Sequence, residues 1–433
     1  MTKITIIMPC LNVASYIKKT VDSIISQTMF ENLEILIIDA GSTDGTYEIV
    51  SWYEHRYENI RLIKSEKKSY GYQVDIGIKE ARGKYVAILE TDDYVREDMY
   101  EILYDKAERN QVDYIKADFT NFYVSRNGKL IEWDTHLFTD KTQYNKVIDT
   151  RESEYIHRHD FSIWKGIYNR EFLLNNEIFL YESRGAAYQD IGFGQLLHSS
   201  AKRAYYLEDC LYQYRHGRDG SSVNSGRGII YAYGEFSRLF ELAESRYLYL
   251  PGVYEAMLSS FLGEFSLITD IYNLENDLEM KEGMDWLISK IDEGISSGVI
   301  QMEHFRTEDI DLFCKIKENP VAVARDAMEQ KNKRIMQYLS MSGDGCQHIV
   351  FGAGKYGKYA LMQLDQCGVR VDIIWDNGAS VSDIAGIPVK RPDKATLQDG
   401  AKIIIANKYH CEEIRLQLVE MGVKQEQILV YSL

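Results

Sequence analysis

The sequence predicts an α/β protein in three parts. They are an N-terminal domain with a mostly parallel sheet that is large enough to be a catalytic domain (residues 1–225), a helical region (226–344) and a small Rossmann-like domain (345–433). Short apolar runs alternate with amphipathic segments in the first and last parts, whereas the middle part has apolar residues at helical spacing. Alternating strands and helices with short loops form parallel sheets that helices cover on both faces.

Each expected strand of the N-terminal part is a short apolar run that ends in polar residues. These strands are Ile4–Met8, Leu33–Ile38, Ile60–Ile63 and Tyr85–Leu89. Helices are expected between them at Val13–Ser26, from Ser42 onward and at Tyr72–Ala81. Ligands of such sheets bind at the carboxyl ends of the strands. We therefore expect the site at three polar segments, Pro9–Asn12, Asp39–Asp44 and Glu90–Asp93.

The C-terminal part repeats the strand and helix alternation in fewer than a hundred residues. Its expected strands are His348–Phe351, Val371–Trp375, Lys402–Ala406 and Gln427–Tyr431. Gly352, Gly354 and Gly357 follow the first of these strands, and Asp376 ends the second, as in a dinucleotide-binding fingerprint. The domain is too short for a complete two-half NAD fold. A purely structural role, nucleotide binding and orientation of an acceptor all remain open for it.

Composition limits the class of partner and the compartment. The chain has 433 residues, 45% of them hydrophobic, and a net charge of −16, which disfavours nucleic acid and anionic membranes as bulk partners. No segment is long and apolar enough to be an integral membrane segment, and the N-terminus resembles a strand more than a secretory signal. We expect a cytoplasmic protein and leave open peripheral association with the inner face of the membrane and homo-oligomerisation.

Three sequence blocks carry a resemblance to a known family. The blocks Ile6–Asn12, Ile35–Gly45 and Ala87–Asp93, in this order and spacing, resemble family 2 of the inverting glycosyltransferases. The resemblance covers roughly residues 1–220. Tyr70–Gln73, Glu90–Asp93 and Asp98–Glu101 resemble the local pattern of the members that build bacterial capsules and other surface polysaccharides. The resemblance implies a glycosyltransferase-A fold and a hexosyl transfer from a nucleotide-sugar donor, UDP-sugar being favoured, to a saccharide or lipid-linked acceptor.

The resemblance assigns the nucleotide-sugar donor to the strand ends. Asp39 would accept hydrogen bonds from the base or ribose, and its alternative role is that of a turn-forming aspartate. The other expected donor-binding residues are Pro9, Leu11, Asn12, Gly71, Gln73, Glu90, Thr91 and Arg215. Arg215 and Arg218 belong to a loop, Leu211–Ser222, that resembles the one closing over the diphosphate.

The expected metal ligands are Asp92, Asp93 and His216. A sugar-diphosphate leaving group develops negative charge, and carboxylate oxygens hold Mn²⁺ or Mg²⁺ against it. Glu90 stands where the family commonly has the first Asp of an Asp-x-Asp motif, so the charge is kept on a longer arm. The alternatives are a loop cap for the acidic residues and a solvated side chain for His216.

The expected general base is Asp190. Inverting transfer needs a carboxylate near the acceptor hydroxyl to take its proton, and Ala187–Phe193 resembles the segment where the family keeps this base. Gln189 replaces a glutamate that often precedes the base, and a helix-capping role for Asp190 is the alternative.

Two rival functions remain open from the sequence. The chain could be bifunctional, with a C-terminal domain that modifies a nucleotide-sugar using a dinucleotide. It could also be a non-catalytic binding scaffold, because Ala40, Glu90 and Gln189 depart from the family pattern.

Overall fold

A computed structural model describes residues 2–183, 188–218, 226–246, 251–268, 271–378 and 381–431. The chain folds into two compact units. The first unit contains Met1–Phe119, Thr135–Tyr214 and Arg218–Met328, and the second unit contains Thr120–Asp134, Arg215–Gly217 and Glu329–Leu433. Most of the helical region therefore belongs to the same unit as the N-terminal sheet.

The first sheet begins with four parallel strands in the order β3-β2-β1-β4. They are β1 (Ile4–Cys10), β2 (Leu33–Asp39), β3 (Ile60–Lys64) and β4 (Tyr85–Ile88). The helices between them are α1 (Ile17–Ile25), α2 (Thr46–Arg56) and α3 (Tyr70–Glu80). Every residue of β1 and β2 is buried, as expected for parallel strands covered on both faces. The predicted alternation of strands and helices is confirmed here.

The rest of this sheet corrects the prediction of a mostly parallel sheet. Its further strands are β5 (Tyr94–Val95), β6 (Tyr114–Val124), β7 (Leu130–Thr135), β8 (Val147–Ile148), β9 (Gly166–Asn169) and β10 (Ala204–Arg215). Strand β9 runs antiparallel to both β4 and β6, and β10 runs antiparallel to β5 and β8. Local apolar patterns locate a strand but do not fix its direction, because the partner comes from a distant part of the chain.

Helices pack on both faces of this sheet. Alternate residues of β1 point to opposite faces, so Ile7 joins a core with α7, α8 and α9, whereas Ile6 joins a core with α1, α2 and α4. The remaining α-helices of the first unit are α4 (Met99–Asn110), α5 (Glu154–His159), α6 (Arg170–Asn175), α7 (Gln189–Ser200), α8 (Gly228–Arg246), α9 (Pro251–Ser266), α10 (Ile271–Asn276), α11 (Leu278–Ser296) and α12 (Thr307–Glu318). No helix in the described part of the chain is both long and apolar enough to cross a membrane.

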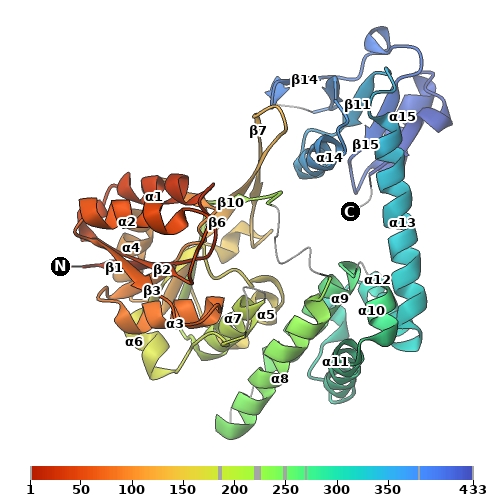
Figure 1. Cartoon of the computed structure of the whole chain (residues 1–433). Helices are drawn as coiled ribbons and strands as arrows, with labels where there is room; N and C mark the ends of the chain where they lie inside the picture. Colours follow the sequence, from red (N-terminus) through yellow and green to blue (C-terminus); the bar gives the residue numbers. More distant parts are fainter. Residues whose placement is uncertain are drawn as a thin grey trace. The chain divides into compact units, whose positions relative to one another are not determined.

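The second unit contains a six-stranded sheet in the order β13-β14-β12-β11-β15-β16. Its strands are β11 (His348–Phe351), β12 (Ile373–Trp375), β13 (Asp383–Ile384), β14 (Ile387–Lys390), β15 (Lys402–Ile405) and β16 (Ile428–Val430). All neighbours are parallel except the β13–β14 hairpin. Helices α14 (Lys355–Gln366) and α15 (Cys411–Glu420) accompany it (Figure 1), and α13 (Pro320–Met341) leads into it. The chain order reverses between β11 and β15, which is a topological switch point.

Candidate active site

The loops after β1 and β2 are fastened to each other. Asp39 is buried at the end of β2, and its Oδ2 accepts hydrogen bonds from the backbone N–H groups of Gly41 (3.0 Å) and Ser42 (3.1 Å). Asn12, with a left-handed φ of 54°, accepts a hydrogen bond from the N–H of Thr43 at 2.9 Å. Asp39 therefore shapes the turn, and its contact with a nucleoside stays a prediction.

Gly71 and Gln73 lie in the first turn of α3, next to these loops. The Gln73 side-chain amide donates to the carbonyl oxygens of Cys10 (3.1 Å) and Ile38 (2.5 Å), and thereby joins the ends of β1 and β2. A Cβ on Gly71 would lie 2.2 Å from the carbonyl oxygen of Tyr181, so close backbone approach requires glycine there. Both residues position the strand ends where the donor is expected.

Pro9, Leu11 and Thr91 lie around the same edge of the sheet. The Thr91 hydroxyl donates to the carbonyl oxygen of Pro9 at 3.4 Å, whereas Leu11 is partly exposed. The structure therefore brings the expected donor residues of the first unit to the carboxyl ends of β1, β2 and β4.

Glu90 begins the carboxylate loop after β4. Its Oε1 accepts a hydrogen bond from the Tyr70 hydroxyl. Burial and, to a smaller extent, the charges of Asp92 and Asp190 together raise the pKa of Glu90 to about 7, against the Tyr70 hydrogen bond. The longer arm of this glutamate thus places a carboxyl group that titrates near neutral pH beside the other two acids.

Asp92 and Asp93 have different surroundings. Asp92 Oδ2 lies 3.1 Å from a guanidinium nitrogen of Arg218, and 15% of its side chain is exposed. Asp93 is almost fully buried, and its Oδ2 accepts a 2.7 Å hydrogen bond from the Tyr212 hydroxyl. Asp92 is consequently the carboxylate of this loop that already accommodates a cation at a partly open position.

Asp190 lies in the first turn of α7, and Tyr188, the residue before this helix, has a left-handed φ of 66°. Burial raises the pKa of Asp190 to about 6, although the N–H of Ile191 and the charge of Lys116 act in the opposite direction. The Asp190 charge in turn raises the pKa of Glu90. These two acids, a hundred residues apart in sequence, are therefore electrostatic neighbours.

Two further glutamates near Asp190 come from the helical region, where the sequence shows no motif. Glu235 on α8 is buried, and burial followed by the Asp190 charge raises its pKa to about 8. The charge of Arg238 and the backbone N–H of Gly192 oppose this rise in the pKa of Glu235. Glu264 on α9 accepts a 2.5 Å hydrogen bond from the Tyr188 hydroxyl, and burial raises its pKa to about 7.

The sequence contains a signal that could have found Glu235. Ala232, Phe236 and Leu239 form the buried stripe of α8, and Glu235 lies between them at helical spacing. A carboxylate on the apolar stripe of an amphipathic helix needs an explanation other than solvent exposure.

A buried network of charged residues lies near Asp190. The ammonium of Lys116 lies 2.8 Å from Asp160 Oδ2, and that of Lys165 lies 3.2 Å from Oδ1. Burial lowers the pKa of Lys116 to about 8, whereas Asp160 opposes this decrease. Lys116 is also the cation that lowers the pKa of Asp190.

Arg215 and His216, predicted to bind the diphosphate and the metal, belong to the second unit. His216 Nε2 lies 2.8 Å from the Asn121 side-chain oxygen, and its ring packs against Trp133. Burial lowers the pKa of His216 to about 4, and Arg215 lies over the ring of Phe122. His216 would have to leave these contacts to bind a metal, so its role stays a prediction. The predicted segments at 187 and 219–222 lie outside the described residues.

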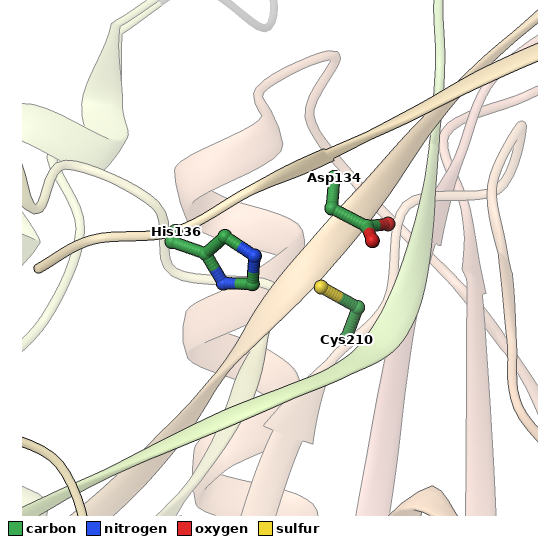
Figure 2. A group of neighbouring side chains, drawn as sticks. All are labelled: Asp134, His136 and Cys210. Carbon is green, nitrogen blue, oxygen red and sulfur yellow. The ribbon is translucent and has the colours of Figure 1, made fainter. Parts of the chain in front are cut away.

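Figure 2 shows another set of side chains of the kind that binds metals, including His136 and Cys210 of the first unit. His136 Nδ1 already lies 2.8 Å from Asp118 Oδ2. The third labelled residue, Asp134, belongs to the second unit, and we infer no metal site from these three residues.

Comparison with known proteins gives the class of the N-terminal part. Residues 5–172 match the sequence profile of glycosyl transferase family 2. An uncharacterized glycosyltransferase of Escherichia coli, YibD, is 30% identical over 49% of this chain and 61% of that protein. A poly(ribitol-phosphate) beta-glucosyltransferase of Bacillus spizizenii is 33% identical over 26% of this chain and 18% of that protein. The chain thus spans less than two thirds of these relatives.

Solved structures show the same fold. The S. aureus TarS fragment 1-349, crystallised with UDP-GlcNAc, matches with a TM-score of 0.58 at 18% identity, over 77% of this chain and 92% of that chain. The N-terminal sheet is thus of the glycosyltransferase-A type, and the comparisons together support a glycosyltransferase.

Proposed function

We propose that the chain is an inverting glycosyltransferase that moves a sugar from a UDP-sugar to a saccharide or lipid-linked acceptor in bacterial surface-polysaccharide synthesis. The observation that carries this proposal is the match of residues 5–172 to glycosyl transferase family 2, within which the acidic loop Glu90–Asp93 follows strand β4. The acidic loop would serve the leaving diphosphate, and Asp190, whose charge acts on Glu90, would serve the attacking hydroxyl. The name of the Bacillus spizizenii relative and the UDP-GlcNAc in the TarS crystal support this donor and product class.

The donor would lie at the carboxyl ends of β1, β2 and β4. Asp39 and the turn that it shapes would contact the nucleoside, and Arg218 would contact the diphosphate. A guanidinium pairs well with phosphate oxygens. The ion pair between Arg218 and Asp92 would then open or be shared when the donor binds.

The residues fit a divalent cation at Asp92. This carboxylate is partly open and already faces a cation, Arg218, and hard oxygen ligands suit Mn²⁺ or Mg²⁺. Asp93 would have to give up its Tyr212 hydrogen bond to share the ion. When bound, the cation would neutralise charge that develops on the leaving diphosphate.

Asp190 would act as the general base. As the acceptor oxygen forms its bond to the anomeric carbon, the bond from that carbon to the donor phosphate breaks, and the hydroxyl proton moves to Asp190. A pKa near 6 leaves this carboxylate ionised at neutral pH, yet basic enough to take the proton. Glu235 and Glu264 would keep the surroundings of Asp190 negative once they ionise.

The test is transfer from UDP-sugars to saccharide acceptors, with the product anomer determined by NMR. We expect Asp190→Asn to reduce kcat by about 10²–10⁴-fold, the usual contribution of general base catalysis. We expect Asp92→Asn to raise the Mn²⁺ concentration that gives half-maximal rate. The exposed Glu241→Gln on α8 is the control and should change neither kcat nor this Mn²⁺ concentration. Full activity of Asp190→Asn, or a product that retains the donor configuration, would refute the proposal.

A further inference from the structure

The second unit contains a cavity that the proposed transfer reaction does not use. Its volume is about 320 Å³, and it lies where strands β11, β12 and β15 end and helix α15 begins. This position is the topological switch point of the sheet, where parallel sheets bind ligands. The volume is at the lower end of the range of about 300–1,000 Å³ for small-molecule sites.

Two of the three glycines of the fingerprint do not require a nucleotide to explain them, whereas nothing lies within 4 Å of a Cβ placed on the third, Gly354. Gly352 has a φ of +126°, and a Cβ there would lie 2.7 Å from the carbonyl oxygen of Ala406, at the end of β15. A Cβ on Gly357 would lie 1.8 Å from the carbonyl oxygen of Gly352. Close packing of the loop against α14 and β15 thus accounts for both positions.

Both carboxylate oxygens of Asp376 accept hydrogen bonds from nearby backbone N–H groups. Its Oδ2 accepts a hydrogen bond from the N–H of Ala353 and its Oδ1 one from the N–H of Gly378, both at 2.8 Å. In a dinucleotide site the loop N–H groups face the pyrophosphate and the acidic residue faces the ribose. In this unit one of those loop N–H groups, that of Ala353, binds the acidic residue instead.

The lining of the cavity is also unsuited to a diphosphate. It contains two carboxylates, Asp376 and Glu413, and none of the described residues that line it is a lysine or an arginine. A diphosphate would meet the like charge of these carboxylates, and the imidazole of His410, which also lines the cavity, already lies 3.0 Å from Glu413 Oε2. The lining therefore selects against nucleotides and dinucleotides.

The same lining suits a neutral ligand with many hydroxyl groups. Asn377 and Gln417 form a reciprocal pair of amide hydrogen bonds, 2.9 Å and 3.1 Å long, that connects the end of β12 to α15. Amide groups both donate hydrogen bonds to hydroxyls and accept them, and ionised carboxylates accept them.

We propose that this cavity binds a neutral saccharide. The inference that this saccharide is part of the acceptor rests on the proposed transferase function. The inference that the cavity binds a saccharide does not. The second unit would then hold acceptor chains for the enzyme, which is a role that needs no cofactor.

The experiment uses the full chain and a panel of neutral disaccharides, namely maltose, lactose, cellobiose and N,N′-diacetylchitobiose, with NAD⁺ and UDP as competing probes. Binding is measured by saturation-transfer NMR and titration calorimetry. We expect a disaccharide to bind and its affinity to fall about tenfold in Gln417→Leu, which removes the side-chain amide, and in Glu413→Gln, which replaces one acceptor oxygen with a donor NH₂ group. Glu412→Gln is the matched control, because Glu412 and Glu413 have side chains exposed to 77% and 78% but only Glu413 lines the cavity.

Three results would overturn the inference, namely no binding by any disaccharide, binding that survives both cavity variants, or NAD⁺ binding that Gln417→Leu abolishes. Should Gln417→Leu fail to fold, the surface variant Glu413→Gln still decides the question. Asp190→Asn separates the two proposals, because it should abolish transfer and leave disaccharide binding in the cavity intact. Binding without any transfer by the wild type would refute the transferase function alone.

Discussion

The guanidinium of Arg218 lies 3.1 Å from Asp92 Oδ2, at the loop where the sequence predicts the metal and the diphosphate. Both side chains are partly exposed, 31% for Arg218 and 15% for Asp92, so solvent screens their attraction. The pair is therefore a weak contributor to stability. Because the pair lies at the predicted diphosphate and metal site, we expect it to affect ligand binding more than stability.

We predict that Arg218→Met raises the KM for the donor by about tenfold or more, because a charge-assisted contact to phosphate is worth about 1.5–3 kcal/mol. The thermal midpoint should change little. Initial rates at varied UDP-sugar concentration give the measurement, with the exposed Lys202→Met as the control for loss of one positive charge. A donor KM equal to that of the wild type would exclude Arg218 from the diphosphate site.

The first four strands were predictable because each is a continuous apolar run that both faces of the sheet bury. The antiparallel strand β9 was not, since its neighbours β4 and β6 come from other parts of the chain. Among the site residues, Asp190 came from a family resemblance and not from periodicity. Glu264 escaped notice because its partner, the Tyr188 hydroxyl, is seventy-six residues away in sequence.

The rate should depend on pH through Asp190. Burial raises the pKa of this carboxyl from 3.8 to about 6, so the base is protonated and inactive below that pH. We predict that log kcat/KM rises with pH up to about 6 and then levels off, with a slope near one on the acid side. The measurement is a pH profile at saturating metal. The residual activity of Asp190→Asn should lack this acid limb, and an identical limb in that variant would assign the titration to another group, such as Glu90.

Gly71 gives a test of how the fold holds the donor loops. Gly71→Ala would place a Cβ 2.2 Å from the carbonyl oxygen of Tyr181, and such overpacking costs about 1–3 kcal/mol in a packed structure. Gly263→Ala on α9 is the matched control, because nothing lies within 4 Å of its Cβ position. That variant should stabilise the protein by about 0.5–1 kcal/mol through helix propensity. Urea unfolding of both variants decides the prediction, which fails if Gly71→Ala is as stable as Gly263→Ala.

Glu235 gives a dependence of stability on pH. Burial raises its pKa in the folded protein to about 8, from 4.5 in the unfolded chain. The folded state therefore binds more protons than the unfolded state between these two values, and this group lowers the free energy of unfolding as the pH rises through that range. Glu235→Gln removes the titration and keeps the shape, so we predict an unchanged thermal midpoint near pH 4 and a higher one at pH 8.

The size of this effect follows from the linkage between stability and the thermal midpoint. Each kcal/mol recovered should raise the midpoint by about 2 °C, the lower end of the range for 150–250 residues, because the first unit is larger than that. Differential scanning calorimetry of wild type and Glu235→Gln at several pH values makes the measurement, with Glu241→Gln as an exposed control on the same helix. A difference between wild type and variant that is the same at pH 4 and pH 8 would show that folding does not raise the pKa of Glu235. The carboxylate would then be ionised beside Asp190 at neutral pH, and the acidity of the proposed base would have to be explained with that charge included.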